Sequence, residues 1–209
     1  MNNREAYNRW ADSYDTVQNK TRDLEAQALR EVLAGRSFKN VMEIGCGTGK
    51  NTEWLSTIAT QLTAVDFSEE MLAKAKKTVP SPNVNFIQAD VTKPWSFTNE
   101  QADLVTCSLI LEHIKNLSHI FHQAAIVLRP DGLFYVCELH PFKQYQGSKA
   151  RFETTTGTFE LECFVHHVSD YIDAAKRNGF VCDDLQEWFD NNDRSGTPRL
   201  ASFLFRLSK

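Results

Sequence analysis

The segment that most constrains this chain is residues 41–50, VMEIGCGTGK. It begins as a short apolar strand, turns through Gly45, Gly47 and Gly49, and continues into an amphipathic stretch. Glycine permits a tight reversal and lets a ligand approach the backbone, because no Cβ stands in the way. The N-terminus of a following helix offers free N–H groups to a negatively charged or carboxylate group. The segment therefore predicts a nucleotide-like ligand at the end of the first strand.

Short apolar runs alternate with longer amphipathic stretches along the chain, which is typical of an α/β sheet with crossover helices. The strands that we expect are Val41–Ile44, Leu62–Val65, Val84–Ile87, Leu104–Ser108, Leu133–Leu139, Val181–Trp188 and Ser202–Leu207. The helices that we expect are Asp23–Leu33, Thr48–Ile58, one from Ser68 to Pro80, Ser118–Leu128 and Ser169–Asn178. The first four strands are short and apolar, as in a parallel sheet that is buried on both faces.

Composition narrows the class of protein further. A chain of 209 residues fits one domain, and its net charge of -4 argues against nucleic acid as a partner, which normally needs a basic surface. The five cysteines are scattered and form no CxxC pair, so neither a zinc site nor a redox dithiol is indicated. No apolar run approaches the roughly 18 residues that span a bilayer. We therefore expect one cytoplasmic domain that makes no membrane contact.

Two acidic residues follow neighbouring strands. Asp66 ends the second strand, twenty-one residues after Gly45, and Asp90 ends the third. A carboxylate at the first position can accept both ribose hydroxyls of an adenosine, and one at the second can reach the adenine amino group. A single acidic residue at a strand end is more often a cap or a loop residue. Two of them behind a glycine turn favour an adenosine-containing ligand.

With these residues in place, residues 38–139 resemble the class I methyltransferases that use S-adenosylmethionine (SAM), specifically the small-molecule type similar to type 11 methyltransferases. The Glu-x-Gly-x-Gly-x-Gly form differs from the Gly-x-Gly-x-x-Gly of nicotinamide enzymes, which counts against an oxidoreductase. The resemblance implies a Rossmann-like sheet of seven mostly parallel strands in the order 3-2-1-4-5-7-6. The last strand would be antiparallel, and helices would cover both faces.

The resemblance also implies a set of contacts with SAM. The glycine turn would cradle the methionine part, Asp66 would hold the ribose, and Phe67 would lie against the adenine. Glu43 would fix the turn, in keeping with a pairing to the turn's own backbone amides, and Cys107 would contribute backbone. The full implied set is Glu43, Gly45, Cys46, Gly47, Gly49, Asp66, Phe67, Asp90, Val91, Cys107 and Tyr14.

Two segments fall outside the alternation of strands and helices. We expect residues 1–209 to form a single domain, with residues 1–35 as an N-terminal helical cover and residues 140–167 as a substrate-side insertion, because ligands in such sheets lie beyond the carboxyl ends of the strands. Tyr14 resembles the tyrosine of the family's mobile cover, whereas a helix that packs Trp10 on the sheet is the alternative. The insertion carries Lys143, Tyr145, Lys149 and Arg151, which would suit a carboxylate- or phosphate-bearing acceptor unless they form an ordinary solvated surface.

The catalytic candidates are histidines. Methyl transfer to a neutral amine needs mainly positioning, whereas transfer to a hydroxyl or a carbon also needs a base. His140 ends the fifth strand and should face the ligand crevice. His113 belongs to a Glu-His pair that lies near the donor in the family but often serves structure, and His166 is one of two adjacent histidines of which at most one is expected in the pocket. His119 and His122 have helical spacing without an acidic or thiol companion, so no metal is expected.

The sequence thus predicts a SAM-dependent methyltransferase that moves a methyl group to an N or O atom of a small metabolite. An anionic acceptor is one hypothesis. A protein that binds SAM without transferring methyl stays open as an alternative, and a nicotinamide-dependent oxidoreductase is the more distant one.

Overall fold

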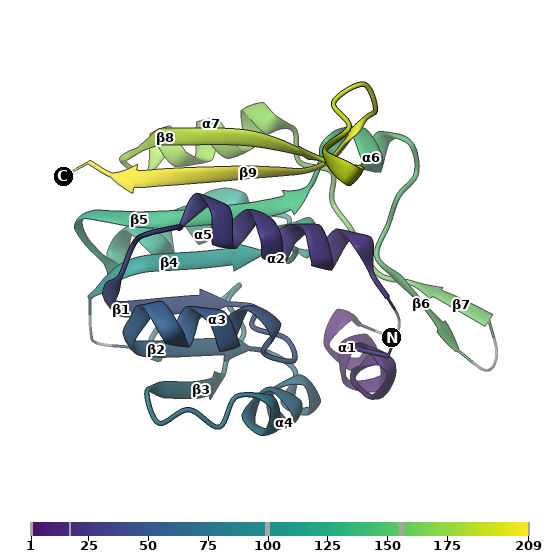
Figure 1. Ribbon diagram of the computed structural model, residues 1–209, viewed down its shortest axis with the longest axis horizontal. Coiled ribbons are helices and arrows are strands. Elements are labelled where there is room, and N and C mark those ends of the chain that lie inside the picture. The colour runs from purple at the N-terminus through teal and green to yellow at the C-terminus, as the bar shows by residue number, and fades with distance from the viewer. Residues whose placement is uncertain (1, 17, 99–100, 155–156, 209) are drawn as a thin grey trace.

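A computed structural model describes residues 2–16, 18–98, 101–154 and 157–208. Its seven-stranded sheet has the order β3-β2-β1-β4-β5-β9-β8 (Figure 1). The strands are β1 (Phe38–Ile44), β2 (Ala59–Asp66), β3 (Val84–Gln88), β4 (Ala102–Ser108), β5 (Leu128–Leu139), β8 (Phe180–Phe189) and β9 (Pro198–Leu207). β9 runs antiparallel to both β5 and β8, whereas β1 to β5 are parallel. The predicted fold class and strand order are confirmed.

The helices cover both faces of this sheet. They are α1 (Asn3–Trp10), α2 (Lys20–Val32), α3 (Lys50–Ile58), α4 (Glu69–Thr78), α5 (Leu117–Val127), α6 (Pro141–Tyr145) and α7 (Val168–Arg177). The helix α2 begins at Lys20, three residues before the expected start, because the Asn19 side chain accepts hydrogen bonds from the backbone amides of Thr21 (3.0 Å) and Arg22 (3.2 Å).

Alternate residues of the central strands supply two separate cores. On β1, Val41 packs with α2 and α3 residues, and the next residue, Met42, belongs to the core beneath α5 and α7. Figure 1 shows α2 and α3 in front of the sheet and α5 and α7 behind it. Successive strand side chains point to opposite faces, so each buried strand must be apolar on both. This explains the short apolar runs in the sequence.

The segment between β5 and α7 contains a second sheet that the sequence reasoning left unassigned. There β6 (Arg151–Thr154) and β7 (Gly157–Glu160) pair antiparallel. In Figure 1 this hairpin extends from the main body beside α1, at the end of the sheet where β1, β2 and β4 finish. Helix α1 and the hairpin β6–β7 therefore both lie at the carboxyl edge of the parallel strands.

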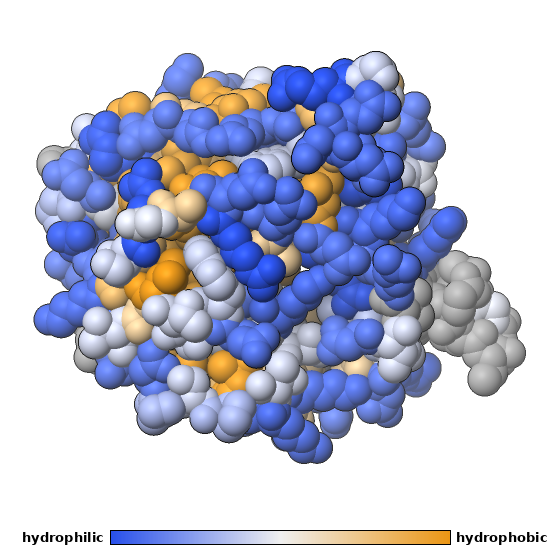
Figure 2. All heavy atoms as spheres, viewed as in Figure 1, coloured by the Kyte–Doolittle hydropathy of each residue, from blue (hydrophilic) through white to orange (hydrophobic). Residues whose placement is uncertain are grey.

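The N-terminal helix packs on the insertion. Ala6 and Leu161 are buried together, with Tyr7, Trp10 and Cys163 packed around them. The alternative that Trp10 packs on the sheet is wrong, because Trp10 belongs to this separate cluster, with its ring 5.8 Å from Tyr7 and 4.8 Å from Tyr14. Seen from the same side, the surface is mostly hydrophilic, with apolar atoms exposed between the elements (Figure 2). No helix among the described residues is both long and apolar enough to cross a membrane.

We expect Phe121→Ala to lower the free energy of unfolding by about 3–5 kcal/mol. The Phe121 side chain is fully buried, and its ring lies 5.1 Å from Phe134 and 5.2 Å from Phe205, so truncation leaves a cavity. Ile126→Ala is the matched control on the same helix, since Ile126 is 57% exposed, and it should change stability by about 0.5 kcal/mol or less. Urea unfolding measures both. Equal losses would contradict this assignment of the core.

Candidate active site

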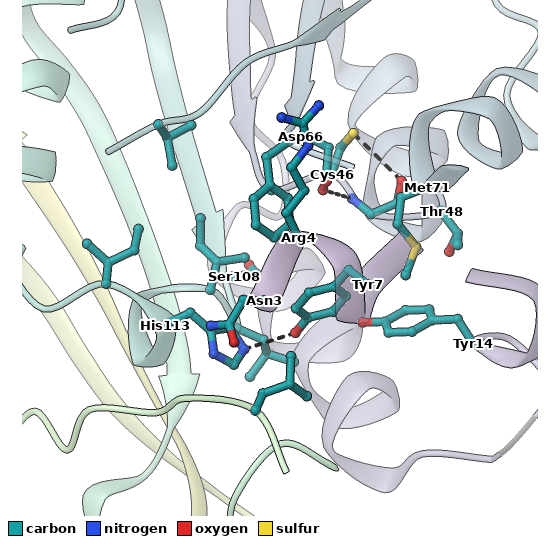
Figure 3. Close-up of a pocket in the computed structure, with 18 of the residues that line it drawn as sticks. Asn3, Arg4, Tyr7, Tyr14, Cys46, Thr48, Asp66, Met71, Ser108 and His113 are labelled. Atoms are coloured by element: carbon teal, nitrogen blue, oxygen red, sulfur yellow. Dashed lines mark hydrogen bonds between the residues drawn. The ribbon is translucent and has the colours of Figure 1, made fainter. Parts of the chain in front are cut away.

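A cavity of about 1170 Å³ lies at the carboxyl edge of the sheet. The glycine turn after β1 and the ends of β2, β3 and β4 form its floor. Residues of α1 and α2 and the segment 160–162 form its walls. Figure 3 shows side chains from these separate elements converging on one space. Segments far apart in the sequence thus enclose a single site.

The backbone of the glycine turn is held against β2. The amides of Gly45 and Cys46 both donate to the carbonyl oxygen of Val65, at 2.8 and 3.0 Å. Gly45 and Gly47 have φ values of 75° and 53°, which other residues adopt only with strain. A Cβ on Gly45 would lie 2.4 Å from the Ile110 side chain, whereas one on Gly47 would meet nothing within 4 Å. Gly45 is therefore required by close packing, and Gly47 leaves space for a ligand.

Glu43 does not pair with the backbone amides of the turn, since the amides of Gly45 and Cys46 donate to Val65. The Glu43 carboxyl group accepts a hydrogen bond from the Thr52 hydroxyl at 2.6 Å. This bond joins β1 to α3. Burial raises the pKa of Glu43 from 4.5 to about 8.

Both strand-end carboxylates line the cavity, and each also organises its own loop. Asp66 accepts from the backbone amides of Gly47 and Ser68, both at 2.9 Å. Burial raises its pKa, although these bonds oppose the shift. Asp90 accepts from the backbone amide of Thr92 at 3.0 Å and from its hydroxyl at 2.6 Å. The two carboxylates therefore face the same space from adjacent strands.

The other expected cofactor residues divide into two groups. Those that line the cavity are Tyr14, Cys46, Phe67 and Val91. Cys107 and Gly49 do not line it. Cys107 is fully buried in the core between the sheet and α5, one residue before the end of β4, and Ser108 at that end lines the cavity instead. Gly49 precedes α3 and packs against Ala75 and Val79.

The three candidate histidines are in different environments. Of them, His113 alone lines the cavity. His140 caps α6, accepting from the Phe142 amide at 3.1 Å, and its Nε2 lies 3.1 Å from Glu187. His166 Nε2 lies 2.8 Å from the carbonyl oxygen of Ile114. The expectations that His140 faces the crevice and that His166 enters the pocket are therefore wrong, because these imidazoles are held by other partners outside the cavity.

The basic residues of the insertion lie outside the cavity as well. Lys149 pairs with Glu160 at 3.3 Å, and the Tyr145 hydroxyl contacts the His167 ring. From this segment Glu160, Leu161 and Glu162 line the cavity instead. The hypothesis of an anionic acceptor therefore gains no support from the insertion. Among the described residues no cluster of three or more histidine, cysteine or acidic side chains could hold a metal.

Comparisons with known proteins agree with this geometry. Residues 42–136 match the family model of a methyltransferase domain. An uncharacterized methyltransferase of Emericella nidulans is 29% identical over 215 residues, covering 84% of this chain and 74% of that protein. The demethylmenaquinone methyltransferase of Leptospira interrogans is 32% identical over 143 residues, covering 63% of this chain and 57% of that enzyme. Residues 42–136 of this chain therefore carry a methyltransferase domain.

Solved structures show the same fold. The N-methyltransferase NodS from Bradyrhizobium japonicum, in complex with S-adenosylhomocysteine (SAH), has a TM-score of 0.75 at 16% identity, with 100% of both chains covered. The chain spans about half the length of several curated relatives that it matches.

Several residues that line the methyltransferase cavity escaped the sequence reasoning. Tyr7 on α1 places its hydroxyl 2.9 Å from His113 Nε2. Glu25 on α2 is 3% exposed; one carboxylate oxygen accepts from Asn51 at 2.7 Å, and the other has no hydrogen-bond partner among the described residues. Glu25 shares a helical stripe with the buried Ala28, so a carboxylate on an apolar stripe was a usable signal. Nothing in the sequence pointed to Tyr7.

Gly45→Ala tests whether close packing at the turn supports the cofactor site. Alanine there meets both the strain of positive φ, roughly 1–2 kcal/mol, and the contact with Ile110. We expect SAH binding, measured by calorimetry, to weaken at least about tenfold, which corresponds to about 1.4 kcal/mol. Gly35→Ala is the control, because Gly35 has φ 71° with no atom near its Cβ position. It should lower stability but leave SAH affinity unchanged; an equal loss of affinity would refute the packing argument.

The pKa of Glu43 predicts a pH-dependent stability. Between its ordinary pKa of 4.5 and the folded-state pKa of about 8, the folded protein holds a proton that the unfolded chain has released. The contribution of Glu43 to the free energy of unfolding is therefore complete below about pH 4.5. It is lost as the pH rises towards 8, by at most about 1.4 kcal/mol per pH unit. Urea unfolding from about pH 5 to about pH 8 should show a flatter dependence for Glu43→Gln than for the wild type. The same pH dependence of stability in both proteins would contradict the raised pKa of Glu43.

Proposed function

We propose that this methyltransferase transfers the methyl group of SAM to an N or O atom of a small metabolite. The observation that carries the proposal is the cavity that joins the glycine turn to His113 beneath α1. Ligand pockets commonly measure about 300–1,000 Å³. A cavity of about 1170 Å³ therefore has room for a cofactor and a modest second molecule.

The residues present fit SAM. SAM carries a positively charged ammonium and sulfonium, and Glu25 brings to the cavity wall a buried carboxylate oxygen without a hydrogen-bond partner. A buried carboxylate is costly unless it is paired, so a cationic group there would remove the cost. We assign the ammonium to Glu25, the ribose to Asp66 and the adenine edge to Asp90. When bound, SAM supplies an electrophilic methyl group.

The walls of the cavity favour a small acceptor. α1 and residues 160–162 line the space above the strand ends, so the site is a cavity of metabolite size and not a broad face for a folded protein or a duplex. The demethylmenaquinone and NodS relatives are named for a quinone precursor and for N-methylation, respectively. Both names are compatible with a metabolite-sized acceptor. We propose that residues 3–14 and 160–162 form the cover of the acceptor side.

Two measurements test the proposal. Calorimetry should show binding of SAM and SAH but not of NAD, and radiolabelled SAM should transfer methyl into the small-molecule fraction of a cell extract. Asp66→Ala should weaken SAM binding about 10- to 100-fold, since hydrogen bonds to charged groups contribute about 1.5–3 kcal/mol. Asp184→Ala, on the edge strand β8, is the control and should bind normally.

The possible outcomes separate the alternatives. SAM binding without any labelled product would favour a binding protein and contradict methyl transfer. Binding of NAD in place of SAM would favour an oxidoreductase. Label found only on macromolecules would contradict the small-metabolite acceptor.

A further inference from the structure

The protonation of the His113 ring follows from its partners. Its Nδ1 lies 2.9 Å from the backbone carbonyl oxygen of Glu162. A carbonyl oxygen can only accept, so Nδ1 carries the hydrogen, and Nε2 of the neutral ring is then an acceptor. The Tyr7 hydroxyl lies 2.9 Å from Nε2 and must therefore be the donor (Figure 3). The proton of Tyr7 is thus already directed at His113.

This arrangement leaves the Tyr7 oxygen able only to accept from a ligand. Tyr7 and His113 both line the cavity, so a ligand hydroxyl placed against Tyr7 would donate its own hydrogen there. A ligand with only acceptor atoms would find no donor at this oxygen. The pair is therefore suited to a molecule that has a proton to lose.

The charged groups around the pair determine where a proton can stay. Glu112 Oε1 lies 4.0 Å from His113 Nε2, and Cys163 Sγ lies 3.8 Å from Nδ1. Burial, with Tyr14, Glu112 and Asp66 as neighbours, raises the pKa of Tyr7 well above its usual value. A tyrosinate is therefore disfavoured there. Burial also raises the pKa of Glu112, and His113 Nε2 is the acceptor that lies within hydrogen-bond distance of the Tyr7 hydroxyl.

The two covering segments complete this arrangement together. The Asn3 side chain on α1 donates to the Glu162 carbonyl at 3.1 Å and accepts from the Glu162 amide at 3.2 Å. The Phe164 amide donates to the Glu112 carbonyl at 2.6 Å. α1 brings Tyr7, and the segment 161–164 brings the carbonyl that sets the tautomer of His113. Both must be docked before the pair is assembled.

We propose that Tyr7 and His113 form a proton relay that deprotonates a hydroxyl-bearing acceptor, and that docking of α1 and residues 161–164 assembles it. This inference rests on the proposed function and narrows the acceptor to one with a hydroxyl group. The O–H bond of the acceptor breaks as its proton moves to the Tyr7 oxygen, and the proton of Tyr7 moves to His113 Nε2. The acceptor oxygen takes the methyl group from SAM, SAH remains, and His113 later releases its proton to solvent.

The first test does not require the acceptor. NMR of the full-length protein with ¹⁵N-labelled histidine and bound SAH should show His113 as the Nδ1–H tautomer, and Tyr7→Phe should shift its Nε2 resonance. Tyr145→Phe is the matched control, because it removes a hydroxyl that contacts another histidine, His167, outside the cavity. It should leave the His113 resonances in place. A His113 ring protonated at Nε2 would overturn the relay.

The second test uses the small molecule that receives label from SAM in the extract. Tyr7→Phe should lower kcat at neutral pH by about 100-fold or more, with SAH affinity within about twofold of the wild type. Its kcat should rise more steeply with pH than that of the wild type, because only an ionised acceptor can react once the relay is broken. Tyr145→Phe should match the wild type.

The combined variants distinguish a relay from a purely structural contact. Tyr7→Phe with His113→Gln should be no slower than the slower single variant, because the two residues act as one unit. Multiplied losses, reduced SAH affinity or an unchanged pH profile would overturn the relay while leaving methyl transfer intact. A labelled nitrogen or carbon would overturn the hydroxyl acceptor. No labelled product at all would refute the proposed function and the relay with it.

Discussion

The carbonyl oxygen of Val65 accepts hydrogen bonds from the amides of Gly45 and Cys46, and the rest of the site depends on this contact. It ties the turn after β1 to the end of β2, so Asp66 follows directly beside the glycine backbone. Asp66 then accepts from the Gly47 amide and holds the turn from the other side. Buried backbone donors require partners, and here the neighbouring strand provides them. The cofactor site is thus a product of parallel strand pairing.

The acceptor side has a different physical basis. Its walls come from α1 and the segment after β7, which hold each other through Asn3 and the Glu162 backbone. These elements pack through a small separate cluster around Ala6 and Leu161, apart from the two main cores. Segments with few buried apolar contacts open at lower free-energy cost than the core. Donor and acceptor sides therefore differ in how rigidly they are built.

Individual residues show how far sequence reasoning reached. The strands and most helices were predictable, because buried parallel strands need apolar residues on both faces and helices carry cap residues such as Ser68. The hairpin β6–β7 was missed, since the insertion was treated as a lid without strand assignment. Glu25 could have been found from the sequence, because it is a carboxylate on the buried stripe of its helix. The backbone contact expected of Cys107 was wrong, because β4 extends one residue further and Ser108 at its end lines the cavity.

The sequence by itself determined the fold class and predicted that the glycine turn and the acidic strand ends meet at one edge of the sheet, because they are local features that parallel pairing brings together. Only the tertiary structure decided which histidine faces the cavity. His140 contacts Glu187, 47 residues away, and His166 contacts Ile114 at a separation of 52. Tyr7 and His113 are 106 residues apart. The direction of a loop side chain depends on such distant partners, and no local pattern encodes them.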